Sequence, residues 1–230
     1  MIILLILTLI LSIALLVVWT RWRRTIRADY IRTYMFPKGI FDKLQIKRPE
    51  LTIKDCQLTA HALRQYFLAY LKSGCKFVSM PSQVADDLWH ELILYTRHYE
   101  AFCDQAFGRF MHHTPAVVLS ADKQDNTGLR RIWWYSCLEE NINPRQPTRL
   151  PLLFALDTKL NIPDGFKYAP NCEQLRKKEG RGSSSGAIYC GGDFSSSSYD
   201  GSTDGFGDSS SGEGGGDSGG GCGGGCGGGD

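Results

Sequence analysis

The sequence lacks several motifs that would indicate an enzymatic activity. It contains no C-x-x-C pair, no G-x-S-x-G motif and no glycine-rich phosphate loop ahead of a helix. His90-Glu91 begins like the zinc-peptidase motif H-E-x-x-H, but Leu94 stands where the second histidine belongs. Alternating polar and apolar residues are also missing over any useful length, which predicts few strands. These absences favour a mainly α protein and reveal no reaction.

Positive charge is absent from the end of the chain, because no lysine or arginine follows Arg181. Residues 1–181 hold all 26 basic side chains and 17 of the 24 acidic ones, a net charge of +9. The acids beyond them are Asp193, Asp200, Asp204, Asp208, Glu213, Asp217 and Asp230. Such a basic body favours anionic surfaces, whereas the acidic tail is expected to repel itself and extend.

The eight cysteines do not follow a regular disulfide pattern. Their spacing is irregular, and Cys222 and Cys226 lie in glycine sequence that would not hold a fixed bridge geometry. Free cysteine packs as a small hydrophobe. We therefore expect the body cysteines to be reduced thiols, in agreement with a cytoplasmic location.

Residues 2–20 are predicted to form a transmembrane anchor. The uncharged run 2–19 would be about 27 Å long as a helix, close to the roughly 30 Å of a bilayer core. Its positive charge follows the run and no A-x-A-like site is present, which argues against a cleaved signal peptide. The positive-inside rule then predicts a single-pass protein of the cell (inner) membrane, with its N-terminus outside and its body in the cytoplasm.

Residues 21–37 form a basic juxtamembrane segment before Pro37. We expect it to lie against anionic lipid headgroups, so the lipid bilayer is the first predicted partner. The expected interface residues are Trp19, Arg21, Trp22, Arg23, Arg24 and Arg27. Much of the excess positive charge lies here, and no nucleic-acid partner is expected.

Residues 38–178 are predicted to be a small helical bundle. Apolar periodicity and stop signals indicate helices at about 51–72, 81–107, 126–138 and 150–160. Residues 179–230 are rich in Gly, Ser and Asp and have too little apolar surface to offset their ordering entropy. The predicted class is therefore mainly α, with one transmembrane helix, a helical bundle and a disordered Gly/Ser-rich tail.

The second predicted helix has two distinct faces. On a helical wheel, Asp86, His90 and Arg97 form a polar row opposite the apolar face, and Trp89 lies at the border. The apolar face consists of Val84, Leu88, Leu92, Tyr95, Tyr99, Phe102 and Ala106. The polar row predicts either a solvated surface or one wall of a binding site.

The second wall of such a site would be Gly108–Pro115, which contains His112 and His113. Adjacent histidines on an extended segment point in opposite directions, so only one would face the helix. A continuous helix advances about 25 Å from His90 to Phe107, whereas five returning residues span at most about 17 Å. A metal site of His90, His112 and His113 is thus demanding unless the helix ends early, and a transition metal such as zinc would be its cofactor.

The stretch "DDLWHELILYTRHYEAFC…FGRFMHHTP" resembles the core of bacterial membrane-associated proteins of unknown function, described as glycine-rich-domain-containing protein-like. The "CGGGCGGG" tail is similar in composition, and a looser D-x-x-W-H similarity extends to the plant glycine-rich domain proteins. Many relatives carry a second histidine where this chain has Leu92. The matching residues are Trp89, His90, Tyr95, Thr96, Arg97, Tyr99, Cys103, Gly108, His112, His113 and Pro115. The resemblance implies a shared module and supplies no activity.

Two functions from different classes remain open, so the chain is not assigned as an enzyme. The first is a cytoplasmic helical module that binds an unknown protein or small molecule through Asp86, Trp89, His90, Arg97, His112 and His113. The second is a metal-dependent hydrolase, with Glu91 or Asp86 as the base. A Cys103–histidine pair is disfavoured, because Cys103 lies close to the apolar face, where a thiol is inert.

Overall fold

The computed structural model describes residues 1–113, 127–170 and 188–190, and within them the protein is mainly α-helical. The helices are α1 (Ile2–Thr33), α2 (Ile40–Lys47), α3 (Ile53–Lys72), α4 (Gln83–Leu94), α5 (Thr96–Ala106), α6 (Thr127–Glu139) and α7 (Leu152–Lys159). The strands β1 (Lys167–Ala169) and β2 (Ile188–Cys190) pair in parallel, with Tyr168 opposite Tyr189. The predicted mainly α class is confirmed.

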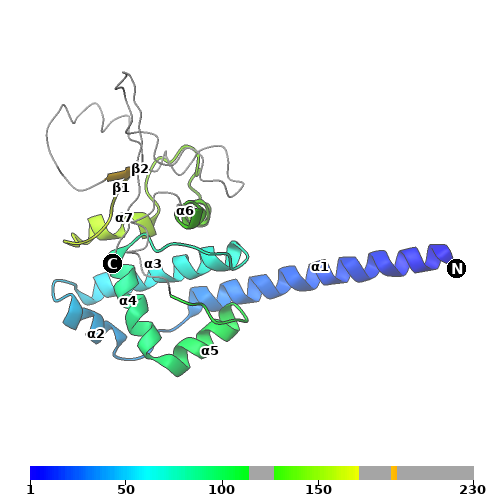
Figure 1. The fold of residues 1–230 in the computed structure, drawn as a ribbon, viewed down its shortest axis with the longest axis horizontal. Coiled ribbons are helices and arrows are strands. Elements are labelled where there is room, and N and C mark those ends of the chain that lie inside the picture. Colours follow the sequence, from blue (N-terminus) through cyan, green and yellow to red (C-terminus); the bar gives the residue numbers. More distant parts are fainter. Residues whose placement is uncertain (114–126, 171–187, 191–230) are drawn as a thin grey trace, which may run out of the picture.

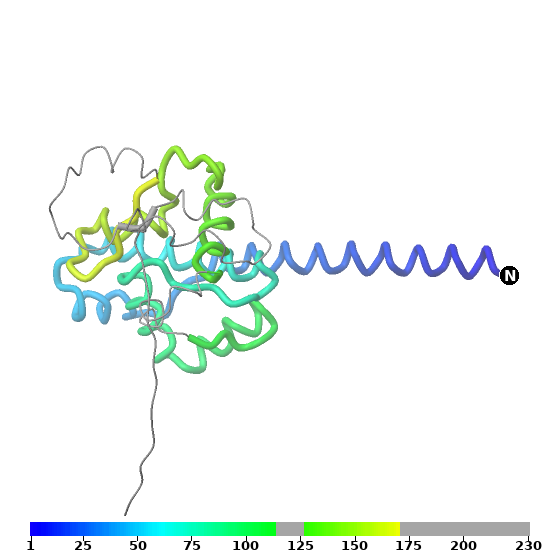
Figure 2. Tube along the Cα trace, turned by 45° about the horizontal axis from the view of Figure 1, so that its top comes forward, coloured from blue at the N-terminus to red at the C-terminus, as the bar shows by residue number. Residues whose placement is uncertain are grey.

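Helix α1 is a single straight helix of 32 residues that projects from the body (Figures 1 and 2). Its N-terminal side chains are exposed, and an 18-residue window has a mean hydropathy of 3.2. By length and composition it can cross a membrane, although a signal sequence near an N-terminus has the same properties.

The last turns of α1 pack against the body. Ala28 and Ile31 are buried, and the ring of Tyr34, just past the helix, lies 4.4 Å from that of Phe102. Arg64 of α3 donates to the Tyr34 carbonyl from Nε at 3.0 Å and from Nη2 at 2.8 Å. The basic segment therefore continues α1 as one rigid helix that is fixed to the domain.

Helix α3 is the centre of the domain and lies between α6 and α7 on one side and α1, α2 and α4 on the other (Figure 1). It begins with a capping box, in which Thr52 Oγ1 accepts from the Asp55 amide and Asp55 accepts from the Thr52 amide. It ends before Gly74, whose φ of +77° suits glycine. The sequence predicted this helix within two residues.

Other elements agree less closely with the sequence-based expectations. The helices predicted at 126–138 and 150–160 are α6 and α7, whereas the eight-residue α2 was not predicted. The helix predicted at 81–107 is two helices, because the chain turns at Tyr95. Cys56, Cys103 and Cys137 are buried free thiols, as expected for packed cysteines, and Cys75 is a half-buried one. The predicted tail, 179–230, lies outside the described residues apart from β2.

Candidate functional site

The start of α4 is held by a buried carboxylate from α7. Asp157 accepts hydrogen bonds from Ser82 Oγ at 2.7 Å and from the amides of Gln83 and Val84 at 2.7 and 3.2 Å. A fourth comes from the Phe166 amide at 2.9 Å. Amides at a helix N-terminus have no partner within the helix, and the helix dipole favours a negative charge there. This cap fixes where α4 begins.

The two aspartates of the first α4 turns are both buried and point to different partners. Asp87 pairs with Lys47 Nζ at 2.6 Å and Arg48 Nε at 2.8 Å, both from the end of α2. Arg48 also binds Asp164, at 2.5 and 2.8 Å. Asp87 therefore joins α4 to α2 and, through Arg48, to the loop after α7. Asp86 takes no part in this network.

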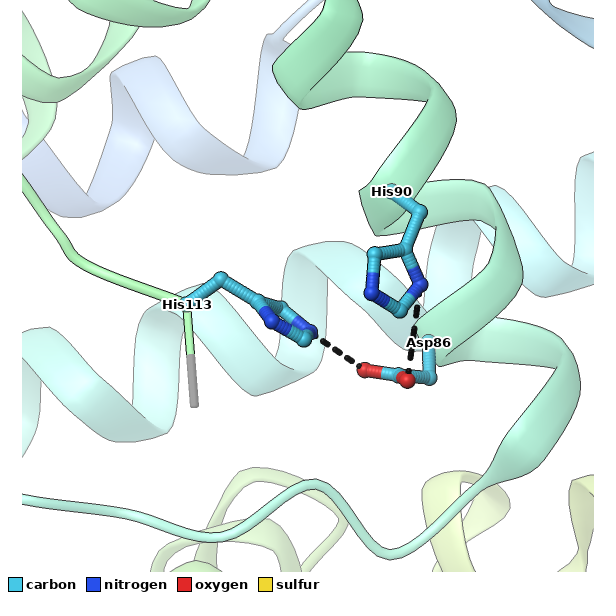
Figure 3. Close-up of side chains that lie close together, drawn as sticks. All are labelled: Asp86, His90 and His113. Carbon is cyan, nitrogen blue, oxygen red and sulfur yellow. Dashed lines mark hydrogen bonds and ion pairs between the residues drawn. The ribbon is translucent and has the colours of Figure 1, made fainter. Parts of the chain in front are cut away.

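Asp86 contacts two histidines, one from α4 and one from the segment after α5 (Figure 3). His113 Nε2 lies 2.8 Å from Oδ1 of Asp86, and His90 Nδ1 lies 3.5 Å from Oδ2. The second contact is an ion-pair approach and not a hydrogen bond, since His90 Nδ1 is a buried atom without a hydrogen-bond partner. The two imidazole rings are 4.2 Å apart. One ligand atom from each residue can be chosen so that all lie within 4.8 Å of one another.

This cluster revises the prediction that a return of the His112-His113 segment to His90 is geometrically demanding. That prediction assumed one helix from 81 to 107, but α4 ends at Leu94 and α5 starts in a new direction at Thr96. Tyr95, between them, has φ −83° and ψ 58°, which is outside the helical region. The chain therefore folds back, and the segment after α5 returns beside α4 instead of beyond its end.

Trp89 is a buried wall of the cluster and not a border residue as predicted. It is 1% exposed, and its ring lies 4.5 Å from the ring of His113 in an edge-to-face arrangement. Its Nε1 donates to the Tyr99 hydroxyl at 3.2 Å, and that hydroxyl donates to the Met111 carbonyl at 2.6 Å. This chain of hydrogen bonds fixes the backbone two residues before His113.

Two of the six predicted site residues lie away from the cluster. His112 is exposed and its ring lies 5.0 Å from that of Phe110, which agrees with the expectation that adjacent histidines diverge. Arg97 is exposed on α5, because the turn at Tyr95 interrupts the predicted polar row. The cluster thus contains Asp86, His90 and His113, with Trp89 in contact.

Burial makes the cluster asymmetric. The side chains of Asp86 and His113 are 5% and 12% exposed, whereas that of His90 is 44% exposed. The prediction that His90 stands outside the core agrees with this, and of the two alternatives for the polar row, a solvated surface does not describe Asp86. Among the described residues, only these histidines make ion-pair contacts with Asp86. A buried carboxylate is costly without a compensating positive charge, and a bound cation is one source of such a charge.

The donor set fits a transition metal. Two imidazoles and a carboxylate are ligands that zinc and related ions accept, and three protein ligands leave a position open for water or substrate. Ligands of one zinc ion lie at most about 4 Å apart, so small side-chain rotations would bring the three donors together. Asp86 was not among the predicted metal ligands, although its i, i+4 spacing from His90 places both on one helix face.

Two features bear on alternatives considered from the sequence. Burial raises the pKa of the Cys103 thiol, so a Cys103 nucleophile is disfavoured. Leu92, at the position where many similar proteins have a second histidine, is fully buried in the core. A side chain at position 92 therefore faces away from the cluster. Having leucine there instead of histidine does not remove a ligand from the cluster.

The fold and the cluster define a helical domain carried on a long apolar helix, with a histidine–carboxylate centre between α4 and the segment after α5. A family model described as UCP032817-like matches residues 26–194, and the chain belongs to this family. The matched region begins within the basic part of α1 and includes the whole cluster. Neither the curated proteins nor the solved structures contain a match to the chain.

Proposed function

We propose that the protein is a single-pass membrane protein whose cytoplasmic helical module binds a divalent transition metal, such as zinc, through Asp86, His90 and His113. The observation that carries this proposal is the convergence of three metal-ligating side chains around a buried carboxylate. A bound cation would compensate the charge of Asp86, whose side chain is only 5% exposed.

The metal would make the module a receptor for a further ligand. Structural zinc sites use four protein ligands, whereas sites that exchange ligands keep one position open. The exposed side of His90 leaves this position accessible from solvent. An anionic or nitrogen-containing small molecule, or a side chain of a protein partner, would complete the coordination.

The membrane part of the proposal places residues 2–20 in the inner membrane and the body in the cytoplasm. Support comes from the length and hydropathy of α1 and from Arg21, Arg23, Arg24 and Arg27, which directly follow the apolar run. The buried, reduced cysteines of the body agree with a reducing compartment.

Metal titration of the full chain, purified in detergent and stripped with a chelator, tests the metal site. Cobalt(II) is the probe, because its visible spectrum reports coordination and thiolate ligands add charge-transfer bands. We expect one equivalent bound by nitrogen and oxygen donors, lost in His90→Ala, His113→Ala and Asp86→Asn. His112→Ala is the matched control and should bind normally. Stoichiometric binding that survives in all three site variants would refute the proposal.

Metal-assisted hydrolysis is a second candidate, favoured by the open coordination position. Asp86 would serve as a ligand, so Glu91, the half-buried residue after His90, is the candidate base. Cobalt-loaded full chain would be assayed with p-nitrophenyl acetate and p-nitrophenyl phosphate. Turnover that is lost in Glu91→Gln while the metal is retained would favour the hydrolase. A wild-type protein that binds cobalt but shows no turnover would favour the binding module.

A further inference from the structure

Two loops of the domain lie beside the basic part of α1. The first, residues 73–78, follows α3, and the second, residues 108–112, follows α5. The guanidinium of Arg27 lies against Gly108, where a side-chain Cβ would come within 2.4 Å of Arg27 Nη2. Burial raises the pKa of the Cys75 thiol, and the nearby charges of Arg109, Arg27 and Arg24 act in the opposite direction. The two loops and the arginines of α1 therefore form one end of the domain (Figure 1).

A cavity of about 400 Å³ opens between these two loops. Its lining combines aromatic and apolar side chains with the polar groups of Arg109 and His112, and consists of Tyr66, Tyr70, Cys75, Phe77, Val78, Arg109, Phe110, Met111 and His112. Arg109 joins the loops, since Nη2 donates to the Tyr70 hydroxyl at 3.3 Å and to the Cys75 carbonyl. Its remaining guanidinium nitrogens bond to none of the described residues and are available for an anion.

The position of α1 places this end of the domain at the membrane surface. If α1 crosses the bilayer as proposed, the apolar run ends near Trp19, and Arg27 lies eight residues further, about 12 Å along the helix. The headgroup region is about 5–8 Å thick on each side of the hydrocarbon core. The backbone of Arg27 therefore lies about 4–7 Å above the headgroup region, and long side chains from the loops beside it can reach the headgroups.

The exposed side chains at this end suit such a surface. Phe77 and Phe110 are 45% and 46% exposed, and Lys76 and Arg109 stand next to them in the same loops. Asp104, exposed on the last turn of α5, is an acidic side chain near this end. Aromatic rings flanked by basic side chains are typical of surfaces that bind anionic lipids.

We infer that the cleft between residues 73–78 and 108–112 binds an anionic phospholipid of the membrane that holds α1. The phosphate binds Arg109 and Arg27, and the rings of Phe77 and Phe110 contact the headgroup layer beside it. The inference rests on the proposed membrane span and is independent of the metal site. A lipid is favoured over a soluble partner because α1, as a membrane span, would hold this cleft close to the bilayer surface.

The test uses the full chain reconstituted in nanodiscs of phosphatidylcholine alone or of equal parts phosphatidylcholine and phosphatidylglycerol. Amide hydrogen exchange in residues 73–78 and 108–112 is measured in both. We expect several-fold slower exchange in the anionic discs. Arg109→Gln should weaken this protection about fivefold, the factor associated with one basic residue at a membrane surface.

Lys54→Gln is the matched control, because Lys54 is exposed at the opposite end of α3, about 27 Å from Lys72. Arg109→Lys should retain most of the protection, and thermal unfolding of each variant checks its fold. Equal exchange in both lipids would overturn the inference, as would equal protection by inorganic phosphate added to phosphatidylcholine discs. A chain that fails to enter nanodiscs would instead overturn the proposed membrane span.

Discussion

Nε2 of His113 lies 2.8 Å from Oδ1 of Asp86, although 27 residues separate them in the chain. Two local features create this contact. The turn at Tyr95 gives α5 a new direction, so that the segment after α5 returns beside α4, and the Tyr99 hydroxyl links the Met111 carbonyl to the Trp89 indole. The cluster therefore depends on the arrangement of α4, the turn at Tyr95 and α5. A substitution elsewhere in this arrangement should weaken it without changing any of its three members.

Removing the Tyr99 hydroxyl should loosen the cluster from a distance. Tyr99→Phe keeps the ring but leaves the Trp89 N–H and the Met111 carbonyl without their buried partner, at a cost of about 1–3 kcal/mol. We expect a lower denaturation midpoint and several-fold weaker cobalt binding, because His113 loses its fixed backbone. Tyr95→Phe is the matched control, since that hydroxyl donates to the Lys38 carbonyl in a more exposed setting. Equal effects of the two variants would contradict the prediction.

The Asp157 cap should be one of the strongest single contributors to stability. Asp157→Asn keeps the shape but replaces one accepting oxygen by an amide that cannot accept from the backbone N–H groups it meets. Buried donors are left unsatisfied, which should cost about 3 kcal/mol. Equilibrium denaturation in detergent measures the loss. Thr158→Ala, at the exposed neighbouring position, should change the free energy of unfolding by less than about 0.5 kcal/mol.

The helices with strong apolar periodicity could be located from the sequence, and the site only in part. Thr52, Asp55 and Gly74 mark the ends of α3, so its predicted limits were accurate. Tyr95 carries no such signal, because neither proline nor glycine stands at the turn. The burial of Asp86 depends on His113, a partner that local periodicity does not contain. Tertiary contacts therefore decided the features that the sequence left open.

The span prediction can be tested by breaking it. The wild-type chain should remain in membranes after an alkaline carbonate wash, with its N-terminal residues intact by mass spectrometry. Leu11→Arg places a charge in the middle of the apolar run, at a cost of about 3 kcal/mol for insertion, and should release the protein. Leu94→Arg, at an exposed position of the body, is the control. Release of the wild-type chain or cleavage after the run would contradict the anchor.

The Arg48–Asp164 ion pair should make stability depend on pH in the acid range. Hydrogen bonds from Arg48 lower the pKa of Asp164 below its ordinary value. The native state therefore binds fewer protons here than the unfolded state, so the contribution is complete above the unfolded pKa of about 3.9 and is lost as the pH falls through the folded value. Asp164→Asn should lower the denaturation midpoint most at neutral pH, with a difference that shrinks below about pH 4.

The partner residue supplies the control for this prediction. In an Arg48→Gln background the guanidinium hydrogen bonds to Asp164 are gone, so the effect of Asp164→Asn should there vary much less with pH, because only the backbone amide and Lys47 still lower the pKa of Asp164. Arg48→Gln also leaves the buried Asp87 with Lys47 as its ion-pair partner, which lowers stability. This loss is common to Arg48→Gln and to the double variant with Asp164→Asn, so it cancels when the two are compared. A difference between wild type and Asp164→Asn that stays constant from neutral to acid pH would show that the ion pair does not set the acid sensitivity.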